Sequence, residues 1–108
     1  MAQTLSILIP VYNEKATVLE LLRRVEAVSL PVGKEIIIVD DGSTDGTSEL
    51  LVGLGGRAAV VRHERNRGKG AALRTAISRA TGEFAIVQDA DLEYDPADYP
   101  TILGPLLD

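Results

Sequence analysis

Two aspartates separated by one residue, Asp89 and Asp91, have the side chains and the spacing to bind a metal ion. They follow the apolar run 83–87, and two carboxylates at this spacing can approach one another. Hard divalent cations such as Mg²⁺ and Mn²⁺ take carboxylate oxygens as ligands and usually share them with phosphates. The alternative is an acidic turn that caps a helix beginning near Asp98. The pattern is common by itself, so the surrounding segments decide its meaning.

A second acidic segment, residues 40–47, reads DDGSTDGT and also follows an apolar run. Its first glycine permits a tight turn, and the three polar residues after that glycine can cap the next helix. A tight turn followed by a helix cap explains one acidic residue at the strand end, but it does not explain two adjacent ones. Asp41 could accept hydrogen bonds from the N–H groups of a nucleobase, as a carboxylate reads the edge of guanine or uracil. Adjacent side chains of an extended strand point in opposite directions, so only one of Asp40 and Asp41 can face such a ligand.

A third segment, residues 62–73, is basic and glycine-rich and precedes an amphipathic stretch. Glycines before a helix let backbone N–H groups approach an anion, and the helix N-terminus favours negative charge. Lys69 adds a positive charge there. The segment is not a P-loop, because it lacks the upstream glycine and the following Ser or Thr, and a solvated loop is the alternative. His63, the only histidine, is interpreted as a surface residue at a strand end and not as a ligand.

A fourth polar segment, residues 10–14, ends the first apolar run. Tyr12 could stack on a base or a ribose, and Glu14 could bond a ribose hydroxyl. A structural role explains the same residues about as well, with Tyr12 as a half-buried cover and Glu14 as a partner of the helix dipole.

Alternating strands and helices position these four segments. Four apolar runs rich in β-branched residues predict strands, and their near-continuous apolarity predicts burial on both faces, as in a parallel sheet. Between them lie three stretches with apolar residues at helical spacing. The predicted strands are 5–9, 35–39, 58–61 and 83–87, and the helical stripes are Val18, Leu21, Leu22 and Val25, then Leu50, Leu51 and Leu54, then Leu73, Ala76, Ile77 and Ala80.

The strict alternation predicts an α/β fold, a Rossmann-like three-layer sandwich with a mostly parallel sheet and right-handed crossovers. The carboxyl ends of parallel strands meet at one edge of the sheet, and ligands of open α/β sheets bind in the crevice outside that edge. Four acids are expected there, and they repel one another unless a cation or hydrogen-bond donors neutralise them. They are Asp40, Asp41, Asp89 and Asp91.

Composition narrows the class of protein. The 108 residues predict one domain, residues 1–108, and the net charge of −5 argues against a broad surface for nucleic acid. The absence of cysteine excludes disulfides and thiolate metal sites. The N-terminal apolar run is too short for a membrane span and lacks the basic flank of a signal peptide, so we expect a cytoplasmic location.

The four polar segments, in this order and at this spacing, resemble family 2 glycosyltransferases of the GT-A fold. The closest likeness is to dolichyl- and polyprenyl-phosphate sugar transferases, especially the mannosyltransferases. The segments that carry the resemblance are IPVYNE at 9–14, VDDGSTDGT at 39–47, NRGKGAAL at 66–73 and QDADLE at 88–93.

This resemblance implies an inverting transfer of a sugar from a nucleoside-diphosphate donor, GDP-mannose or a UDP-sugar, to a dolichyl or polyprenyl phosphate. It implies that Asp89 and Asp91 are catalytic and hold Mg²⁺ or Mn²⁺ against the diphosphate, with Glu93 assisting. It places further residues around the nucleoside diphosphate, with Lys69 near the base or the phosphates. These are Pro10, Tyr12, Glu14, Val39, Asp41, Lys69 and Ala90.

Such enzymes continue beyond the segments seen here, so we expect the chain to be a truncated, N-terminal, nucleotide-sugar-binding part that does not transfer sugar alone. We expect the complete enzyme to be membrane-associated at the cytoplasmic face. The apolar stripe of a helix at 98–107 would favour a homodimer. Two alternatives stay open: a receiver-like Mg²⁺-binding signalling domain and a non-catalytic half-domain that dimerises. Against the first, the paired acids follow the second predicted strand and not the first.

Overall fold

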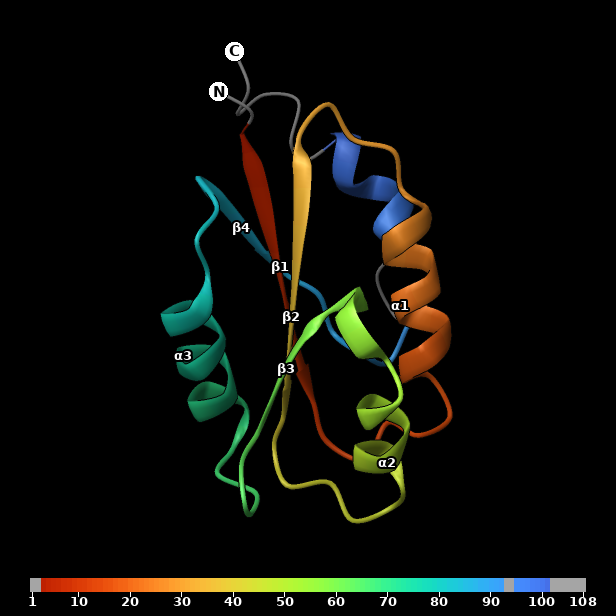
Figure 1. Ribbon diagram of the computed structural model, residues 1–108, viewed down its shortest axis with the longest axis vertical. Coiled ribbons are helices and arrows are strands. Elements are labelled where there is room, and N and C mark those ends of the chain that lie inside the picture. Colours follow the sequence, from red (N-terminus) through yellow and green to blue (C-terminus); the bar gives the residue numbers. More distant parts are fainter. Residues whose placement is uncertain (1–2, 93–94, 102–108) are drawn as a thin grey trace.

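Four parallel strands form a central sheet in the order β3-β2-β1-β4 (Figure 1). The computed structural model describes residues 3–92 and 95–101. The predicted α/β fold with its parallel sheet is confirmed. The strands are β1 Thr4–Val11, β2 Gly33–Asp40, β3 Ala59–Arg62 and β4 Phe84–Val87, and the helices are α1 Val18–Ala27, α2 Thr47–Val52 and α3 Lys69–Arg79, with short 3-10 turns η1 Gly55–Arg57 and η2 Pro96–Asp98.

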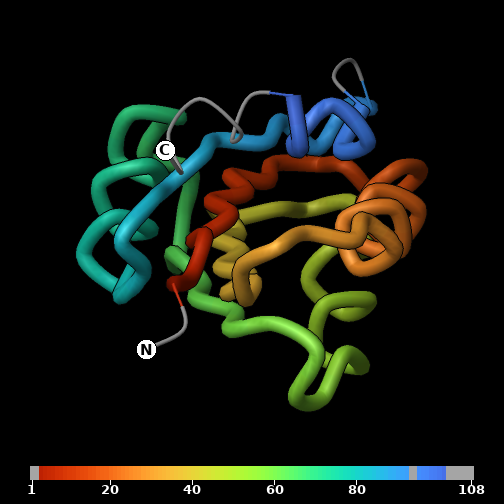
Figure 2. Tube along the Cα trace, turned by 90° about the horizontal axis from the view of Figure 1, so that it is seen from above, coloured from red at the N-terminus to blue at the C-terminus, as the bar shows by residue number. Residues whose placement is uncertain are grey.

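The helices cover both faces of the sheet, which gives three layers (Figures 1 and 2). Alternate side chains of β1, including Ile7 and Ile9, pack with the α1 stripe on one face. Leu8 points the other way and packs with Ala72 and Ala76 of α3. The stripe predicted for α1 is fully buried, because its apolar residues recur with the helical period. β1 therefore lies at the centre of the core, and every other layer contacts it.

Two sequence predictions about burial are wrong. β3 and β4 were expected to be buried on both faces, but they are the edge strands, and Val60 and Val87 are 40% and 47% exposed. Ile77 was expected in the α3 stripe but is 60% exposed, whereas the buried residues of α3 are all alanines. Small side chains allow α3 to lie close to the sheet. Most of the helix predicted at 98–107 falls outside the described residues.

The order of the strands creates a crevice at the carboxyl ends of β1 and β4. The chain adds β2 and then β3 on one side of β1, and α3 then carries it across to β4 on the other side. The connections on the two sides of β1 diverge at this switch point, where open α/β sheets bind their ligands. Among the described residues, no helix has both the length and the apolar character needed to cross a membrane.

A close backbone contact joins the turn after β2 to the loop after β3. Gly42 has a φ of +76°, and a Cβ atom there would lie 2.4 Å from the carbonyl carbon of Arg65. Positive φ is inexpensive only for glycine, and no side-chain atom fits at this distance. The contact holds the loop 63–68 against the end of β2.

We expect Gly42→Ala to lower the free energy of unfolding by about 2 kcal/mol or more, because it combines backbone strain with a backbone clash. Gly56→Ala is the matched control, since nothing lies within 4 Å of its added Cβ. It should change the stability by less than about 1 kcal/mol. Urea unfolding of both variants measures the difference, and equal stabilities would show that the 42–65 contact is not needed.

Candidate functional site

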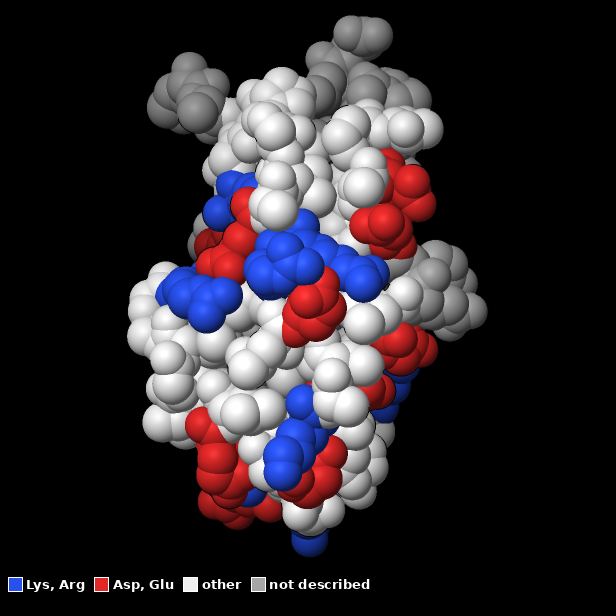
Figure 3. Space-filling view, turned by 90° about the vertical axis from the view of Figure 1, so that its right-hand side faces the viewer, with Lys and Arg blue, Asp and Glu red and all other residues white. Residues whose placement is uncertain are grey.

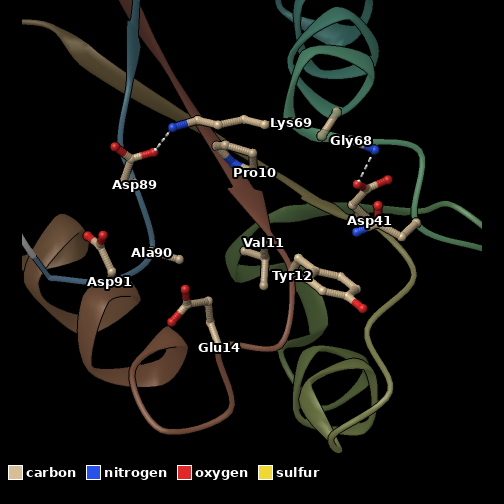
Figure 4. A pocket seen from close by; sticks show the side chains of 12 residues that line it. Pro10, Val11, Tyr12, Glu14, Asp41, Gly68, Lys69, Asp89, Ala90 and Asp91 are labelled. Atoms are coloured by element: carbon tan, nitrogen blue, oxygen red, sulfur yellow. Dashed lines mark hydrogen bonds and ion pairs between the residues drawn. The ribbon is translucent and has the colours of Figure 1, made fainter.

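A pocket of about 560 Å³ lies at the switch point (Figure 4). Its walls come from the end of β1 and the residues after it, from the segments after β2 and β4, and from the loop before α3 and the N-terminal end of α3. Of the sequence-predicted residues, Val39 is not among those lining it, and Glu93 lies outside the described residues. The lining residues are Pro10, Val11, Tyr12, Glu14, Asp41, Asn66, Gly68, Lys69, Ala72, Asp89, Ala90 and Asp91.

Val39 is buried in the core below the pocket. It is 0% exposed and packs with Leu8 and with Ala72 and Ala76 of α3. Val39 and Asp41 are two residues apart, so their side chains point to the same face of the sheet. α3 covers Val39, whereas Asp41 lies just past the end of β2. The Val39 side chain therefore supports the pocket floor, and the predicted contact of Val39 with a ligand stays a prediction.

The segment 89–91 is held from behind by side chains that the sequence analysis did not single out. The carbonyl oxygen of Ala90 accepts a hydrogen bond from Thr17 Oγ1 at 2.6 Å. The side chain of Gln88 donates to the carbonyl oxygen of Asp89 at 3.2 Å and accepts from the Tyr99 hydroxyl at 2.6 Å. Gln88 and Tyr99 are each 2% exposed, and burial raises the pKa of Tyr99 above its usual range. A polar Gln directly after an apolar strand was the one signal in the sequence.

The charge of Asp89 is compensated by Lys69, whose Nζ lies 2.5 Å from Asp89 Oδ1. Both side chains line the pocket, and 58% of the Lys69 side chain is exposed. Asp91 lies on the same rim, so two carboxylates from one turn face the pocket (Figure 4). Among the described residues, no three acidic or histidine side chains group as a metal site. Two carboxylates still suit Mg²⁺, which commonly takes only one or two from the protein and completes its shell with water and phosphate.

Asp40 faces away from the pocket, so the expected group of four acids is divided. Its carboxylate accepts hydrogen bonds from the backbone N–H of Ser43 at 3.0 Å and from the Ser48 hydroxyl. Arg62 Nε lies 3.8 Å from Asp40 Oδ2, and both residues line a cavity between α2 and β3. The alternation of side chains at the end of β2 was predicted correctly, and Asp41 is the acid that faces the pocket.

Asp41 is buried and surrounded by hydrogen-bond donors. Its Oδ1 accepts from the backbone N–H of Arg67 at 2.9 Å, and its Oδ2 accepts from that of Gly68 at 2.8 Å. His63 Nδ1 lies 2.7 Å from Oδ1. Burial, the largest single influence, would raise the pKa of Asp41, but the hydrogen bonds from His63 and the two amides outweigh it and hold the pKa below its usual value. The carboxylate is therefore ionised and acts only as an acceptor.

His63 is not the surface residue predicted from the sequence. It is 7% exposed, and its Nε2 lies 2.8 Å from Thr75 Oγ1 of α3. The loop 63–68 turns back over the end of β2, where the backbone N–H of His63 donates to the carbonyl oxygen of Asp40 at 2.8 Å. His63 thus joins β2, β3 and α3 beneath the pocket.

The residues after β1 complete the pocket on the side opposite α3. Tyr12 is 45% exposed and lines the pocket together with Asp41 (Figure 4). The Glu14 carboxylate lies 2.9 Å from the Thr17 hydroxyl, and the Glu14 carbonyl oxygen accepts the N–H of Val18, the first residue of α1. Glu14 therefore stabilises the start of α1 while it lines the pocket, so its structural role does not exclude a ligand.

The face that carries α1 and α2 has acidic and basic side chains interspersed (Figure 3). Glu20 pairs with Arg23 and Arg24, and Arg57 Nη2 lies 2.6 Å from Glu26 Oε1. These pairs are largely exposed, so each contributes little to stability. Opposite charges on this face neutralise one another locally.

Comparison with known proteins matches residues 6–108 to the family model for glycosyl transferase family 2. The chain is 41% identical over 104 residues to an undecaprenyl-phosphate 4-deoxy-4-formamido-L-arabinose transferase of Pseudomonas aeruginosa, covering 91% of this chain and 31% of that protein. It is also 41% identical over 108 residues to a dodecaprenyl-phosphate galacturonate synthase of Rhizobium johnstonii, covering 94% and 32%. The chain thus spans about a third of the length of these curated relatives.

Solved structures resemble the fold closely. Glucosyl-3-phosphoglycerate synthase from Mycobacterium tuberculosis, in complex with Mn²⁺, UDP and glucosyl-3-phosphoglycerate, superposes with a TM-score of 0.79 at 30% identity, covering 97% of this chain and 40% of that one. S. aureus TarS 1–349 gives a TM-score of 0.81 at 28% identity, covering 97% and 32%.

We expect Asp41→Asn to lower the free energy of unfolding at pH 7 by about 1–3 kcal/mol, because an amide nitrogen would then face an N–H donor. The folded pKa of Asp41 is depressed, so its stabilising contribution is present above the unfolded pKa, near 3.9, and is lost as pH falls through the folded value. The difference between wild type and variant should therefore shrink in strong acid.

Urea unfolding at pH 7 and at pH 2.5 to 3 measures this difference. Glu49→Gln, which removes a negative charge from an exposed position of α2, is the control. A wild-type-to-variant difference for Asp41→Asn that is the same at both pH values would contradict the ionised, donor-bound state.

Proposed function

The chain belongs to glycosyl transferase family 2, and we propose that its pocket binds the nucleoside diphosphate of a sugar donor, such as GDP-mannose or a UDP-sugar. The complete enzyme would transfer the sugar to a polyprenyl phosphate with inversion. Family membership decides against the receiver-like signalling domain. The observation that carries the proposal is that one pocket combines an aromatic ring, a buried carboxylate, a helix N-terminus with a lysine, and two adjacent acids.

The nucleoside lies, in this proposal, between the segments after β1 and β2. Tyr12 stacks on the base, and Asp41 accepts a hydrogen bond from the base edge. Glu14 accepts a hydrogen bond from a ribose hydroxyl. Pro10 and Ala90 shape the walls, and all five residues line the pocket.

The diphosphate lies near the N-terminal end of α3, where backbone N–H groups and the helix dipole favour an anion. Lys69, the first residue of α3, pairs with Asp89 in the structure described here. We propose that Lys69 moves from Asp89 to the diphosphate when the donor binds. This exchange releases the carboxylate for a metal ion and keeps charge in the pocket compensated.

Asp89 and Asp91 would hold Mg²⁺ or Mn²⁺, with Glu93 assisting. Bound there, the ion supplies a Lewis acid for the negative charge that gathers on the departing nucleoside diphosphate. The oxygen-only donor set and the Mn²⁺ and UDP present together in the solved synthase support this assignment. Thr17 and Gln88 keep the two aspartates in place through the backbone of their turn.

The acceptor of the complete enzyme is proposed to be a polyprenyl phosphate, as in the names of both curated relatives. A phosphate oxygen is already anionic and can attack without a strong general base. The pocket is consistent with this, because its described lining contains no histidine and His63 has both ring nitrogens engaged below it. A lipid acceptor places the complete enzyme at a membrane surface, for which we propose the cytoplasmic face.

We expect Asp91→Ala to remove metal-dependent nucleotide binding. Calorimetric titration of UDP and GDP, each with saturating Mn²⁺ and with EDTA, should show tighter binding with metal for wild type. The variant should lose at least about 1.4 kcal/mol of this metal-dependent part, a tenfold change. Glu49→Ala, on exposed α2, should behave as wild type. Equal affinities for wild type and Asp91→Ala in Mn²⁺ would reject the metal assignment.

A homodimer is the second property that we propose, because β3 and β4 are edge strands of the described sheet with exposed valines. Unpaired edges favour association, and two-fold pairs are the commonest closed assemblies. Sedimentation equilibrium should show a mass that rises toward the dimer with concentration. Val60→Lys on β3 should lower the association, and a monomeric mass at the highest concentration would exclude it.

A further inference from the structure

We propose that His63 determines which nucleobase the pocket accepts, by holding the Asp41 carboxylate so that a single oxygen faces the base and uracil is selected over guanine. The inference rests on the proposed function, because it assigns the base of the nucleotide that the pocket binds. His63 is not a catalytic residue in this account. It acts through Asp41 as a specificity-determining residue.

The hydrogen bonds of Asp41 leave room for one more donor. An ionised carboxylate offers about four acceptor positions, two on each oxygen. Oδ1 accepts from Arg67 N and lies 2.7 Å from His63 Nδ1, which must carry a proton because it faces an ionised acceptor. Both positions on Oδ1 are thus filled. Oδ2 accepts from Gly68 N alone among these contacts and keeps one position.

The remaining position faces the pocket. Figure 4 shows the oxygen bonded to Gly68 on the pocket side of the carboxylate and the other oxygen on the far side. Only 3% of Asp41 is exposed, so a ligand can touch little more than this one atom. Tyr12 lines the same pocket (Figure 4), and a base stacked on its ring would turn its edge toward the carboxylate.

Uracil and guanine differ in what they present to such an acceptor. Uracil has one N–H donor, at N3, between two carbonyl oxygens. Guanine has two adjacent donors, N1–H and the N2 amino group, and both are satisfied only when two acceptor oxygens face them. At this pocket only one acceptor position is open, because His63 and Arg67 fill the far oxygen, so the second donor of guanine finds no partner. A buried donor without a partner is costly, so guanine is disfavoured.

His63 is suited to this role by its position between two elements. Its Nε2 lies 2.8 Å from Thr75 Oγ1, so α3 fixes the ring while Nδ1 fixes the carboxylate. Removing the donor at Nδ1 leaves Oδ1 with an open acceptor position and one restraint fewer on the carboxylate. The free-energy penalty for binding guanine, the base with two N–H donors, should then be smaller.

The first test uses the wild-type chain with Mg²⁺ and three diphosphates, titrated by calorimetry or NMR. UDP should bind at least about tenfold more tightly than GDP, the ratio that one unpaired buried donor produces. Inosine diphosphate has the purine ring of GDP but only one N–H donor on this edge. It should bind more tightly than GDP, which separates donor number from ring size.

The second test compares three variants by the ratio of GDP to UDP dissociation constants. His63→Asn keeps an N–H donor near the position of Nδ1 and should keep the ratio. His63→Leu removes the donor and should reduce the ratio at least about threefold, which is part of the cost of an unpaired donor. Thr75→Val removes the partner of Nε2 and leaves the Asp41 contact, so it controls for lost stability. A purely structural role would weaken both nucleotides together and leave every ratio unchanged.

The outcomes are distinguishable. If neither UDP nor GDP binds, the proposed function fails and this inference fails with it. If nucleotides bind but GDP binds as tightly as UDP, or inosine diphosphate no better than GDP, only the inference is overturned. An unchanged ratio of GDP to UDP dissociation constants in a folded His63→Leu variant would show that His63 does not select the base. If His63→Leu does not fold, His63→Asn decides. A changed ratio of GDP to UDP dissociation constants in His63→Asn would overturn the role of His63. An unchanged ratio there, together with the expected order of the three diphosphates in wild type, would support it.

Discussion

Burial of an ionised carboxylate is tolerated only where hydrogen-bond donors surround it, and Asp41 imposes this condition at the edge of the sheet that carries the pocket. Two of its donors are consecutive amides of the loop before α3, and the third is the ring of His63. The loop must therefore turn back over β2, and Gly42 is the residue that lets the backbones meet. The position of α3, and with it Lys69, follows from how this one carboxylate is satisfied.

The other half of the pocket depends on a second set of buried hydrogen bonds. Tyr99, Gln88 and Thr17 form the support behind the turn that carries Asp89 and Asp91. These contacts fix the backbone of the turn and leave its carboxylates on the pocket rim. Lys69 connects the two halves, because it starts α3 on one side and pairs with Asp89 on the other. A donor diphosphate placed between them would compete for both partners of this ion pair.

The sequence predicted those parts of the fold that follow from local periodicity. The α1 stripe was correct because each of its residues contacts one continuous core. The gathering of polar segments at one edge followed from parallel strands alone. Burial of β3 and β4 could not be predicted, because the apolar composition of a strand does not show whether it lies at the edge of its sheet. The predicted burial of Ile77 was wrong for a similar reason, because the residues of α3 that face the sheet are alanines and not larger residues.

The errors at the site arise from contacts distant in sequence. His63 was placed at the surface because nothing local shows that the loop folds back onto Asp41, 22 residues earlier. Val39 shares a strand face with Asp41, and only the placement of α3 decides that one is covered and the other is not. The pairing of Lys69 with Asp89 likewise spans 20 residues. The pattern of residue types located the pocket, and the tertiary contacts determined which side chains face it.

The central claim is that the pocket at the switch point binds a nucleoside diphosphate. Two-dimensional NMR of the ¹⁵N-labelled chain, titrated with UDP and Mg²⁺, tests it at individual residues. The account predicts saturable shifts of the backbone amides at Tyr12, Gly68 and Asp91, which line the three sides of the pocket. Shifts confined to the cavity between α2 and β3, or no shifts at millimolar UDP, would contradict it.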